Sequence, residues 1–197
     1  MRYLILGTTE ALRPDGTPLP LGGARLRALL AALAVRGGRP ASVGELAGDV
    51  YGDDPPQDAP AALQALVGRL RRILGREAVV STPGPGYRLV AGPDDIDLYV
   101  FERRAAEAAA RLDAGDPDTA AALLREALGL FRGPALADLP DPAGVRPEAQ
   151  RLAALRHRVE ADLRRGATDG LVPELTELTT ASRRTCAGAP PTDSYRN

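Results

Sequence analysis

Residues 61–76 read AALQALVGRLRRILGR, and residues 78–90 read AVVSTPGPGYRLV. The first stretch repeats apolar residues at the spacing of one helix face: Leu63, Val67, Leu70 and Leu74. Arginines crowd the second half of this helix, beside or away from the apolar stripe. The second stretch predicts a strand, a Gly/Pro turn and a strand. An arginine-bearing helix followed at once by a β-hairpin is typical of a winged helix, whose helix enters the DNA major groove.

The residues before this pair predict strands and two further helices. Residues 2–21 contain a short apolar strand and then a hairpin with its turn at residues 14–17. Residues 24–36 carry leucines at helical spacing. Ser42 and Glu45 have the spacing of a capping box, which starts the next helix. The expected order of elements is therefore β-β-β-α-α-α-β-β.

The second half of the chain predicts helices joined by short Gly, Asp and Pro turns. Apolar periodicity places them at about 96–113, 117–132 and 147–165, and a fourth begins near Leu171. Four residues of the third helix are expected to face inward: Leu152, Leu155, Val159 and Leu163. Helix pairs of this kind are typical of a tetratricopeptide-like array, so the second half is expected to be all-α.

Composition and charge change near residue 92. We expect a winged-helix DNA-binding domain over residues 1–92, an all-α domain over 93–182 and a disordered tail over 183–197. Residues 1–92 contain 11 Arg and 8 acidic side chains, a balance of +3. Residues 93–197 contain 14 Arg and 18 acidic side chains, a balance of −4. A DNA-facing surface is therefore expected in the first half.

The overall composition argues against several classes of protein. The chain has no run of about 18 apolar residues and no signal peptide at its start, which indicates a cytoplasmic location and no membrane partner. Its one cysteine, Cys186, cannot form an internal disulfide, and its one histidine, His157, lies far from it. No carboxylate pair, metal-site spacing or nucleophile pattern is present, so we expect neither an enzyme nor a cofactor.

Five stretches of the chain, in this order, resemble the Streptomyces antibiotic regulatory proteins: LGGARLRALLAALAVRGGRPASVGELAGDVYGDDPP, QALVGRLRRILG, STPGPGYRLV, DDIDLYVFE and LLREALGLFRGPALADLP. The resemblance runs from about residue 2 to about residue 180. It implies an α+β winged helix of the OmpR/PhoB type, followed by a bacterial transcriptional activator domain built of tetratricopeptide-like helices. Such proteins are actinobacterial activators of secondary-metabolite gene clusters.

The same resemblance implies the partners. Family members bind direct repeats in promoters as head-to-tail pairs and recruit the RNA polymerase holoenzyme. We therefore expect this chain to bind double-stranded promoter DNA and RNA polymerase holoenzyme, and to form a homodimer on DNA, at the nucleoid.

The chain departs from the family pattern in three ways. The activator domain usually continues for several helices after the segment that corresponds to LVPELTEL, whereas SRRTCAGAPP follows here, which suggests a truncation or a reading-frame change. In related wings an Arg commonly reaches the minor groove, but Pro83 occupies the matching position, so that contact is expected to be lost. The nucleotide-binding module of some members is not expected, because no Gly-rich loop with Lys is present.

Candidate DNA-contacting residues lie on the arginine helix, on the wing and at one helix start: Gln64, Gly68, Arg69, Arg71, Arg72, Arg88 and Ser42. Arg can bond guanine bidentately and Gln can bond adenine, and Arg88 is a candidate for a backbone phosphate. Ser42 is either a phosphate site or a plain helix cap. Asp53 and Asp54 lie in a loop that can contact RNA polymerase in the resembled proteins or can be a solvated turn.

Three alternatives to an activator remain open at this point. One is a truncated regulator that binds DNA without activating transcription. Another is a protein-interaction module in which the helical half binds a partner and the winged helix serves as a scaffold. The third, an enzyme, would need a pocket lined by acidic residues with perturbed pKa values.

Overall fold

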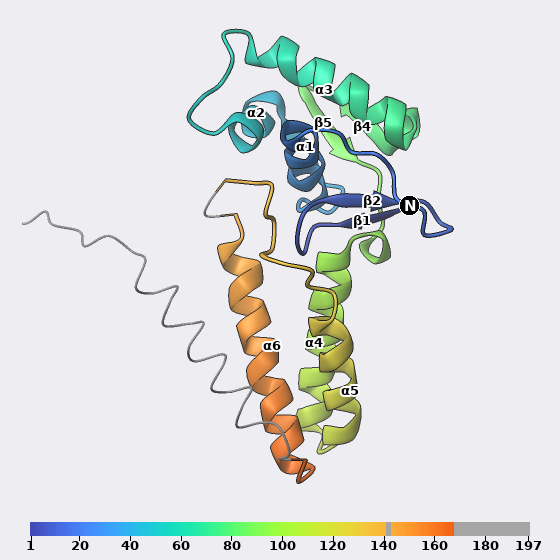
Figure 1. Cartoon of the computed structure of the whole chain (residues 1–197), viewed down its shortest axis with the longest axis vertical. Coiled ribbons are helices and arrows are strands. Elements are labelled where there is room, and N and C mark those ends of the chain that lie inside the picture. The colour runs from blue at the N-terminus through green and yellow to red at the C-terminus, as the bar shows by residue number, and fades with distance from the viewer. Residues whose placement is uncertain (141–142, 168–197) are drawn as a thin grey trace, which may run out of the picture.

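The computed structural model describes residues 1–140 and 143–167. Its first half contains, in chain order, β1 (Arg2–Leu4), β2 (Glu10–Leu12), α1 (Ala24–Ala34), β3 (Ala41–Ser42), α2 (Val43–Tyr51), α3 (Ala59–Leu74), the 3-10 helix η1 (Arg76–Ala78), β4 (Val79–Thr82) and β5 (Gly86–Leu89). β1 and β2 form a two-stranded antiparallel sheet, and the other strands form a three-stranded sheet in the order β3-β5-β4. In Figure 1, α3 and the β4–β5 hairpin lie at one end of the molecule, remote from the later helices.

The predicted strand order is wrong in one place. The turn at residues 14–17 forms, because Arg13 N–H donates to the Thr17 carbonyl at 2.9 Å. The segment after it makes only an isolated bridge between Leu12 and Pro18, so it is no strand. Prolines at positions 18 and 20 supply no N–H for a ladder. The third strand is instead β3, which lies between α1 and α2 and pairs with β5.

The start of α2 and the start of α3 follow local sequence signals. In the capping box of α2, Ser42 N–H donates to the Glu45 carboxylate at 2.8 Å, and Glu45 N–H donates to Ser42 Oγ at 3.2 Å. Asp58 caps α3 by accepting the Ala61 N–H at 3.0 Å. The predicted apolar stripe of α3 is confirmed as core, since all four of its members are buried: Leu63, Val67, Leu70 and Leu74.

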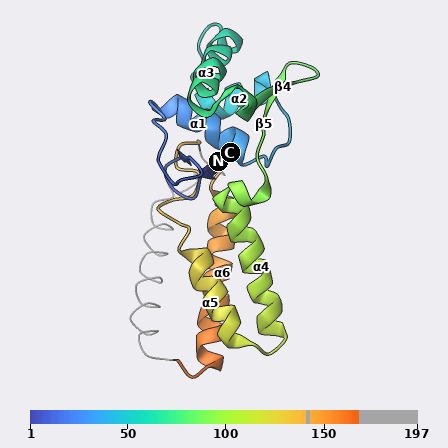
Figure 2. The ribbon, with the colours of Figure 1, turned by 90° about the vertical axis from the view of Figure 1, so that its right-hand side faces the viewer.

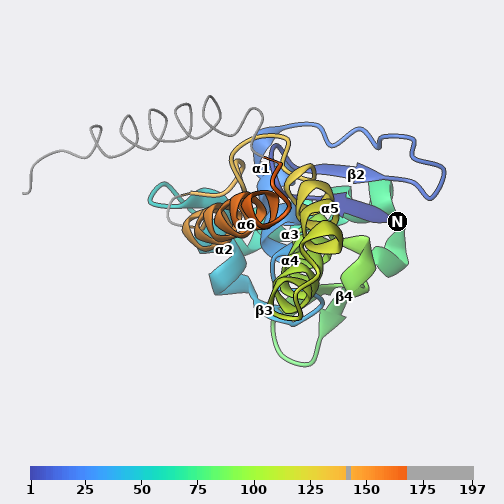
Figure 3. The ribbon, with the colours of Figure 1, turned by 90° about the horizontal axis from the view of Figure 1, so that it is seen from below.

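The second half contains η2 (Pro93–Asp95), α4 (Asp97–Asp113), α5 (Pro117–Leu128) and α6 (Val145–Arg164). The three α-helices run side by side away from the winged helix, as Figures 2 and 3 show from the side and from below. α5 ends at Leu128, before the predicted end at about residue 132. The expected helix near Leu171 and the expected tail over 183–197 lie outside the described residues.

The predicted inward face of α6 is wrong at two of its four residues, whereas Leu155 and Val159 are partly buried. Leu152 and Leu163 are 44% and 57% exposed, whereas Ala154, Ala161 and Asp162 are buried. Small alanines let α6 approach its neighbouring helices closely. Asp162 is tolerated inside because it pairs with Arg125 of α5 and with Arg165. The spacing of large apolar residues does not predict this orientation of α6, because ion pairs between helices do not appear in that pattern.

A buried carboxylate joins the first strand to α4. Asp97 accepts the N–H of Ile5 at 2.8 Å and the N–H of Leu6 at 3.1 Å, and its side chain lies 3.9 Å from Arg132. Burial raises the pKa of the Asp97 carboxyl, against these hydrogen bonds and the arginine, which lower it. Arg132 N–H also donates to the Leu6 carbonyl at 2.8 Å. The backbone of residues 5–6 is thus hydrogen-bonded to residues of the helical half.

One apolar cluster contains residues from both sides of position 92, from Tyr3 and Leu33 to Phe101 and Leu124. Phe101 and Phe131 pack edge to face with ring centroids 5.0 Å apart. The division into residues 1–92, 93–182 and 183–197 stays a prediction. Within the described residues, no helix has the length and apolar character needed to span a bilayer.

Candidate nucleic-acid interface

The outward face of α3 combines small and polar side chains. Ala61, Gln64, Ala65, Arg69 and Arg72 are exposed there, opposite the buried leucine stripe. Small residues along the middle of a helix let another backbone or a groove approach closely. Longer side chains at the margins can then reach base edges or phosphates.

Gly68 lies in the middle of this face, where glycine costs about 1 kcal/mol of helix stability relative to alanine. Packing does not require it, because a Cβ at this position would meet no atom within 4 Å. Beside it is a surface hollow of about 530 Å³, lined by Gly68, Arg71, Arg72 and Arg76. Three arginines line this hollow, and their positive charge suits an anion such as a phosphate.

Arg76 is the member of this hollow that sequence reasoning missed. It lies in η1, just after α3 ends, and its side chain is exposed. Because α3 ends at Leu74 and Gly75 follows it, the helical spacing of Arg69 and Arg72 does not extend to Arg76.

The Arg71 side chain hydrogen-bonds to β4, unlike the side chains of Arg69 and Arg72. Its Nε donates to the Val79 carbonyl at 2.7 Å, its Nη2 donates to Ser81 Oγ at 3.2 Å, and its guanidinium carbon lies 5.7 Å from the Tyr87 ring centroid. Arg72 makes one long local bond, from Nε to the Gly68 carbonyl at 3.3 Å. Arg71 therefore ties α3 to the hairpin.

Strand pairing explains why a carbonyl is available to Arg71. Val90 N–H donates to the Ala78 carbonyl, so hydrogen-bonded pairs recur at alternate positions of the β4–β5 ladder. Val79, opposite Leu89, falls between such pairs and directs its carbonyl away from β5. β4 is an edge strand, and Arg71 satisfies this outward carbonyl.

The start of α3 and the hairpin enclose a second hollow, of about 490 Å³, lined by Asp58, Gln64 and Tyr87 among others. Ser42 lies beside the hairpin, because β3 pairs Ser42 with Gly86 and Val43 N–H donates to the Pro85 carbonyl at 3.0 Å. A Cβ at Gly86 would lie 2.6 Å from the Ala41 carbonyl oxygen, so this pairing requires glycine.

Ser42 and Glu45 are occupied with each other. The Ser42 side chain and backbone both hydrogen-bond the Glu45 carboxylate, which holds the pKa of that carboxyl below its usual value. The Ser42 hydroxyl is thus used as a helix cap, and its role toward a phosphate stays a prediction.

The structure does not gather all the predicted residues. Arg88 is exposed on β5, and because side chains alternate along a strand it lies on the opposite face of the hairpin from Tyr87 and Arg71. Asp53 and Asp54 are exposed in the loop between α2 and α3, where Asp54 N–H donates to the Tyr51 carbonyl at 3.2 Å. Their contact with a polymerase stays a prediction.

Among residues 1–140 and 143–167, no group of three or more His, Cys, Asp or Glu side chains could hold a metal ion.

Two family models match consecutive parts of the chain. Residues 16–89 match the family described as transcriptional regulatory protein, C terminal. Residues 96–183 match the bacterial transcriptional activator domain. The first match contains α3 and the hairpin, and the second contains α4 to α6.

Curated relatives match this chain across both of these parts. The regulatory protein AfsR of Streptomyces griseus is 39% identical over 185 residues, which cover 92% of this chain and 19% of AfsR. The regulatory protein DnrI of Streptomyces peucetius is 35% identical over 196 residues, which cover 91% of this chain and 71% of DnrI. The chain therefore spans about a fifth of the AfsR length.

A solved structure shares the fold. The chain superposes with a TM-score of 0.83 and 30% identity on a structure described as Mycobacterium tuberculosis EmbR in complex with low affinity phosphopeptide. The match covers 92% of this chain and 50% of the EmbR chain. A winged helix followed by a helical region is thus the architecture of this chain.

Proposed function

Because this chain belongs to the family of Streptomyces antibiotic regulatory proteins, we propose that it is a DNA-binding activator of transcription that controls a secondary-metabolite gene cluster. It binds direct repeats in the promoter through α3 and the β4–β5 hairpin. The observation that carries this proposal is the outward face of α3, where arginines surround a hollow beside Gly68.

The arrangement of the molecule supports this role. α3 lies at the end of the molecule away from α4, α5 and α6, so a duplex can approach it without meeting the helical half (Figure 1). Gly68 and the neighbouring alanines remove bulk from the middle of this face, and arginines stand at its margins. A cationic margin around a shallow face fits a groove bounded by two phosphate backbones.

We assign different roles to the arginines of this surface. Arg69, Arg72 and Arg76 are exposed and contact DNA. Arg71 positions the hairpin relative to α3, since its guanidinium is bonded to β4. Gln64 and Gly68 complete the base-facing surface, whereas Arg88 and Ser42 contact backbone phosphates beside the wing.

The remaining parts of the proposal concern partners. The chain binds as a pair on tandem repeats, and its Asp53–Asp54 loop contacts RNA polymerase holoenzyme. This loop is exposed and adjoins α3, so a polymerase subunit on neighbouring DNA can reach it. The protein acts at the nucleoid in the cytoplasm.

Fluorescence anisotropy with labelled promoter DNA that contains tandem repeats tests DNA binding. Wild type, Arg69→Ala and Arg72→Ala are titrated at several salt concentrations. Arg156→Ala is the matched control, since Arg156 is an exposed arginine of α6, far from α3. Each lost phosphate contact should lower the slope of log affinity against log salt by roughly 0.9, whereas a lost base contact should reduce affinity for the repeats and spare random DNA.

Either loss, absent from Arg156→Ala, supports recognition by α3. If folded wild-type protein fails to bind any duplex at low salt, the proposed function is wrong. If Arg156→Ala lowers affinity as much as the α3 variants, binding is a general effect of positive charge and the assignment of α3 is wrong.

A further inference from the structure

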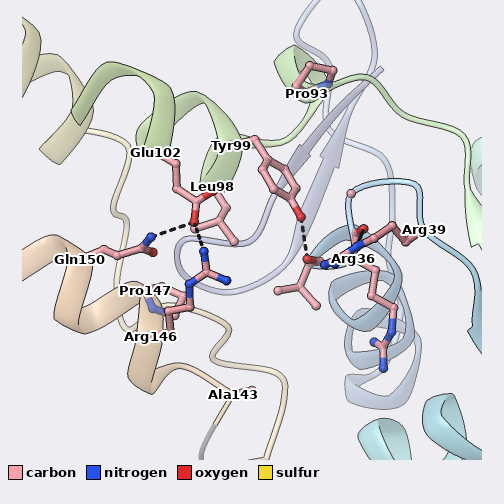
Figure 4. A pocket seen from close by; sticks show the side chains of 12 residues that line it. Arg36, Arg39, Pro93, Leu98, Tyr99, Glu102, Ala143, Arg146, Pro147 and Gln150 are labelled. Carbon is pink, nitrogen blue, oxygen red and sulfur yellow. Dashed lines mark hydrogen bonds and ion pairs between the residues drawn. The ribbon is translucent and has the colours of Figure 1, made fainter. Parts of the chain in front are cut away.

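A pocket separate from the DNA-facing surface lies where the two halves of the chain meet. It has a volume of about 450 Å³ and is bounded by residues 35–39 after α1, by the start of α4 and by the start of α6 (Figure 4). Small-molecule sites in proteins commonly measure about 300–1,000 Å³ and often lie at such junctions.

The apolar part of this pocket is held in place. Leu98 and Pro147 are buried, and the ring of Tyr99 lies between α4 and the end of α1. Tyr99 Oη donates to the Val35 carbonyl at 2.7 Å, which fixes the ring across the junction. Such walls can hold a compact aromatic or aliphatic body and exclude water from it.

Among the described residues, one of the arginines at the pocket has no carboxylate partner. The guanidinium of Arg36 is directed to Asp49 of α2 at 2.7 Å, and Figure 4 shows it turned away from the pocket. Arg146 pairs with Glu102 at 3.3 Å. Arg39 is exposed and uses its Nε on the Arg36 carbonyl, and within the described part of the chain it has no carboxylate partner. The two Nη groups of a guanidinium bind carboxylates and sulfonates well.

A hydrogen-bond acceptor at the wall lacks a donor. Gln150 Nε2 donates to the Glu102 carboxylate at 2.9 Å. Gln150 Oε1 is buried, and none of the residues that the structure describes donates to it. A buried acceptor without a partner destabilises the fold, because it has lost its hydrogen bonds to water. A ligand with an N–H or O–H group could supply this donor after a small turn of the amide about its broad final torsion.

From these observations we propose that the pocket binds a small amphipathic anion. The ligand has a compact apolar body, one acidic group for Arg39 and one donor for Gln150. Such a ligand would touch residues of the winged helix and of α4 and α6 at once, and so would strengthen their contact. The proposal goes beyond DNA binding and does not depend on it.

The test uses the full chain without DNA and the fluorescent probe 8-anilinonaphthalene-1-sulfonate, which has an aromatic body, a sulfonate and an N–H donor. The neutral analogue N-phenyl-1-naphthylamine lacks only the sulfonate. We expect saturable binding of one sulfonate probe per chain. Ala143→Phe, which adds a ring to the pocket wall, should weaken binding at least tenfold. Arg39→Gln should weaken the sulfonate probe about fivefold and leave the neutral probe unchanged.

Leu152→Ser is the matched control, because it removes an exposed apolar side chain from α6 that could bind the probe at a different place. It should leave the affinity unchanged. Circular dichroism of each variant checks the fold. The proposal is overturned if no saturable binding occurs, if Leu152→Ser and not Ala143→Phe abolishes it, or if both probes respond equally to Arg39→Gln.

Discussion

Replacing Arg71 with methionine distinguishes a residue proposed to position the hairpin from residues proposed to contact DNA. Methionine keeps much of the length of the side chain and removes its charge and its donors. The change leaves the outward carbonyl of Val79 without its 2.7 Å bond and removes the contact with the Tyr87 ring. The bond to Ser81 is exposed and contributes little.

The magnitude follows from these contacts. A hydrogen bond from a charged group contributes about 1.5–3 kcal/mol, and a cation–π contact near the surface about 0.5–1 kcal/mol. Because Arg71 is half-buried, we expect the free energy of unfolding to fall by about 2 kcal/mol, toward the lower end of the combined range. For a chain of this size that lowers Tm by roughly 4–8 °C.

The assay is thermal and urea unfolding followed by circular dichroism, with Arg69→Ala as the matched control. Arg69 is exposed on the same helix, so its replacement should change stability by less than about 0.5 kcal/mol. Arg71→Met should reduce affinity for repeat and random DNA alike, because the hairpin is displaced for both. If Arg71→Met unfolds with wild-type stability and loses only affinity for the repeats, Arg71 reads bases and the positioning role is refuted.

Three further perturbations probe the frame around this surface. Asp97→Asn should lower the free energy of unfolding by about 2–3 kcal/mol, since one buried backbone N–H then faces an amide donor. The measurement is urea unfolding, with Asp94→Asn, at an exposed ion pair, as the control. An equal loss of stability in the two variants would contradict this prediction. Burial raises the pKa of Tyr3 to about 12, so the folded chain binds this proton more tightly than the unfolded chain. The free energy of unfolding should therefore fall as pH rises from about 10 toward 12. Tyr3→Phe should show a smaller fall in alkaline unfolding curves, and an identical fall would exclude Tyr3 as the cause. Ser42→Ala should return the pKa of Glu45 toward its ordinary value in an NMR titration and weaken the cap by about 1 kcal/mol, and an unchanged pKa would argue against the capping box.

Local signals in the sequence predicted the elements that form the proposed DNA-facing surface. The leucine spacing of α3 and the Gly/Pro turn of the hairpin each depend on residues close together in the chain. Such short-range rules hold because helix periodicity, capping and turn geometry are decided within a few residues. The family resemblance, read from motifs in order, was confirmed by relatives such as DnrI.

Other features of this protein depend on residues far apart in the chain. β3 has two residues and is a strand only because β5 lies beside it. α6 turns its alanines and Asp162 inward because arginines on α5 and at its own end neutralise that carboxylate, so leucine spacing alone could not predict its orientation.

The different roles of the α3 arginines also depend on contacts between residues far apart in the chain. The sequence by itself determined that an arginine-bearing helix precedes a hairpin. It did not distinguish the roles of Arg69, Arg71 and Arg72, because the three are the same residue type on one helix. The tertiary structure turns the Val79 carbonyl of an edge strand toward Arg71 and leaves the other two in solvent. A hydrogen bond between a helix and a strand depends on how the two pack, and packing of separate elements is set by the whole core rather than by neighbours along the chain.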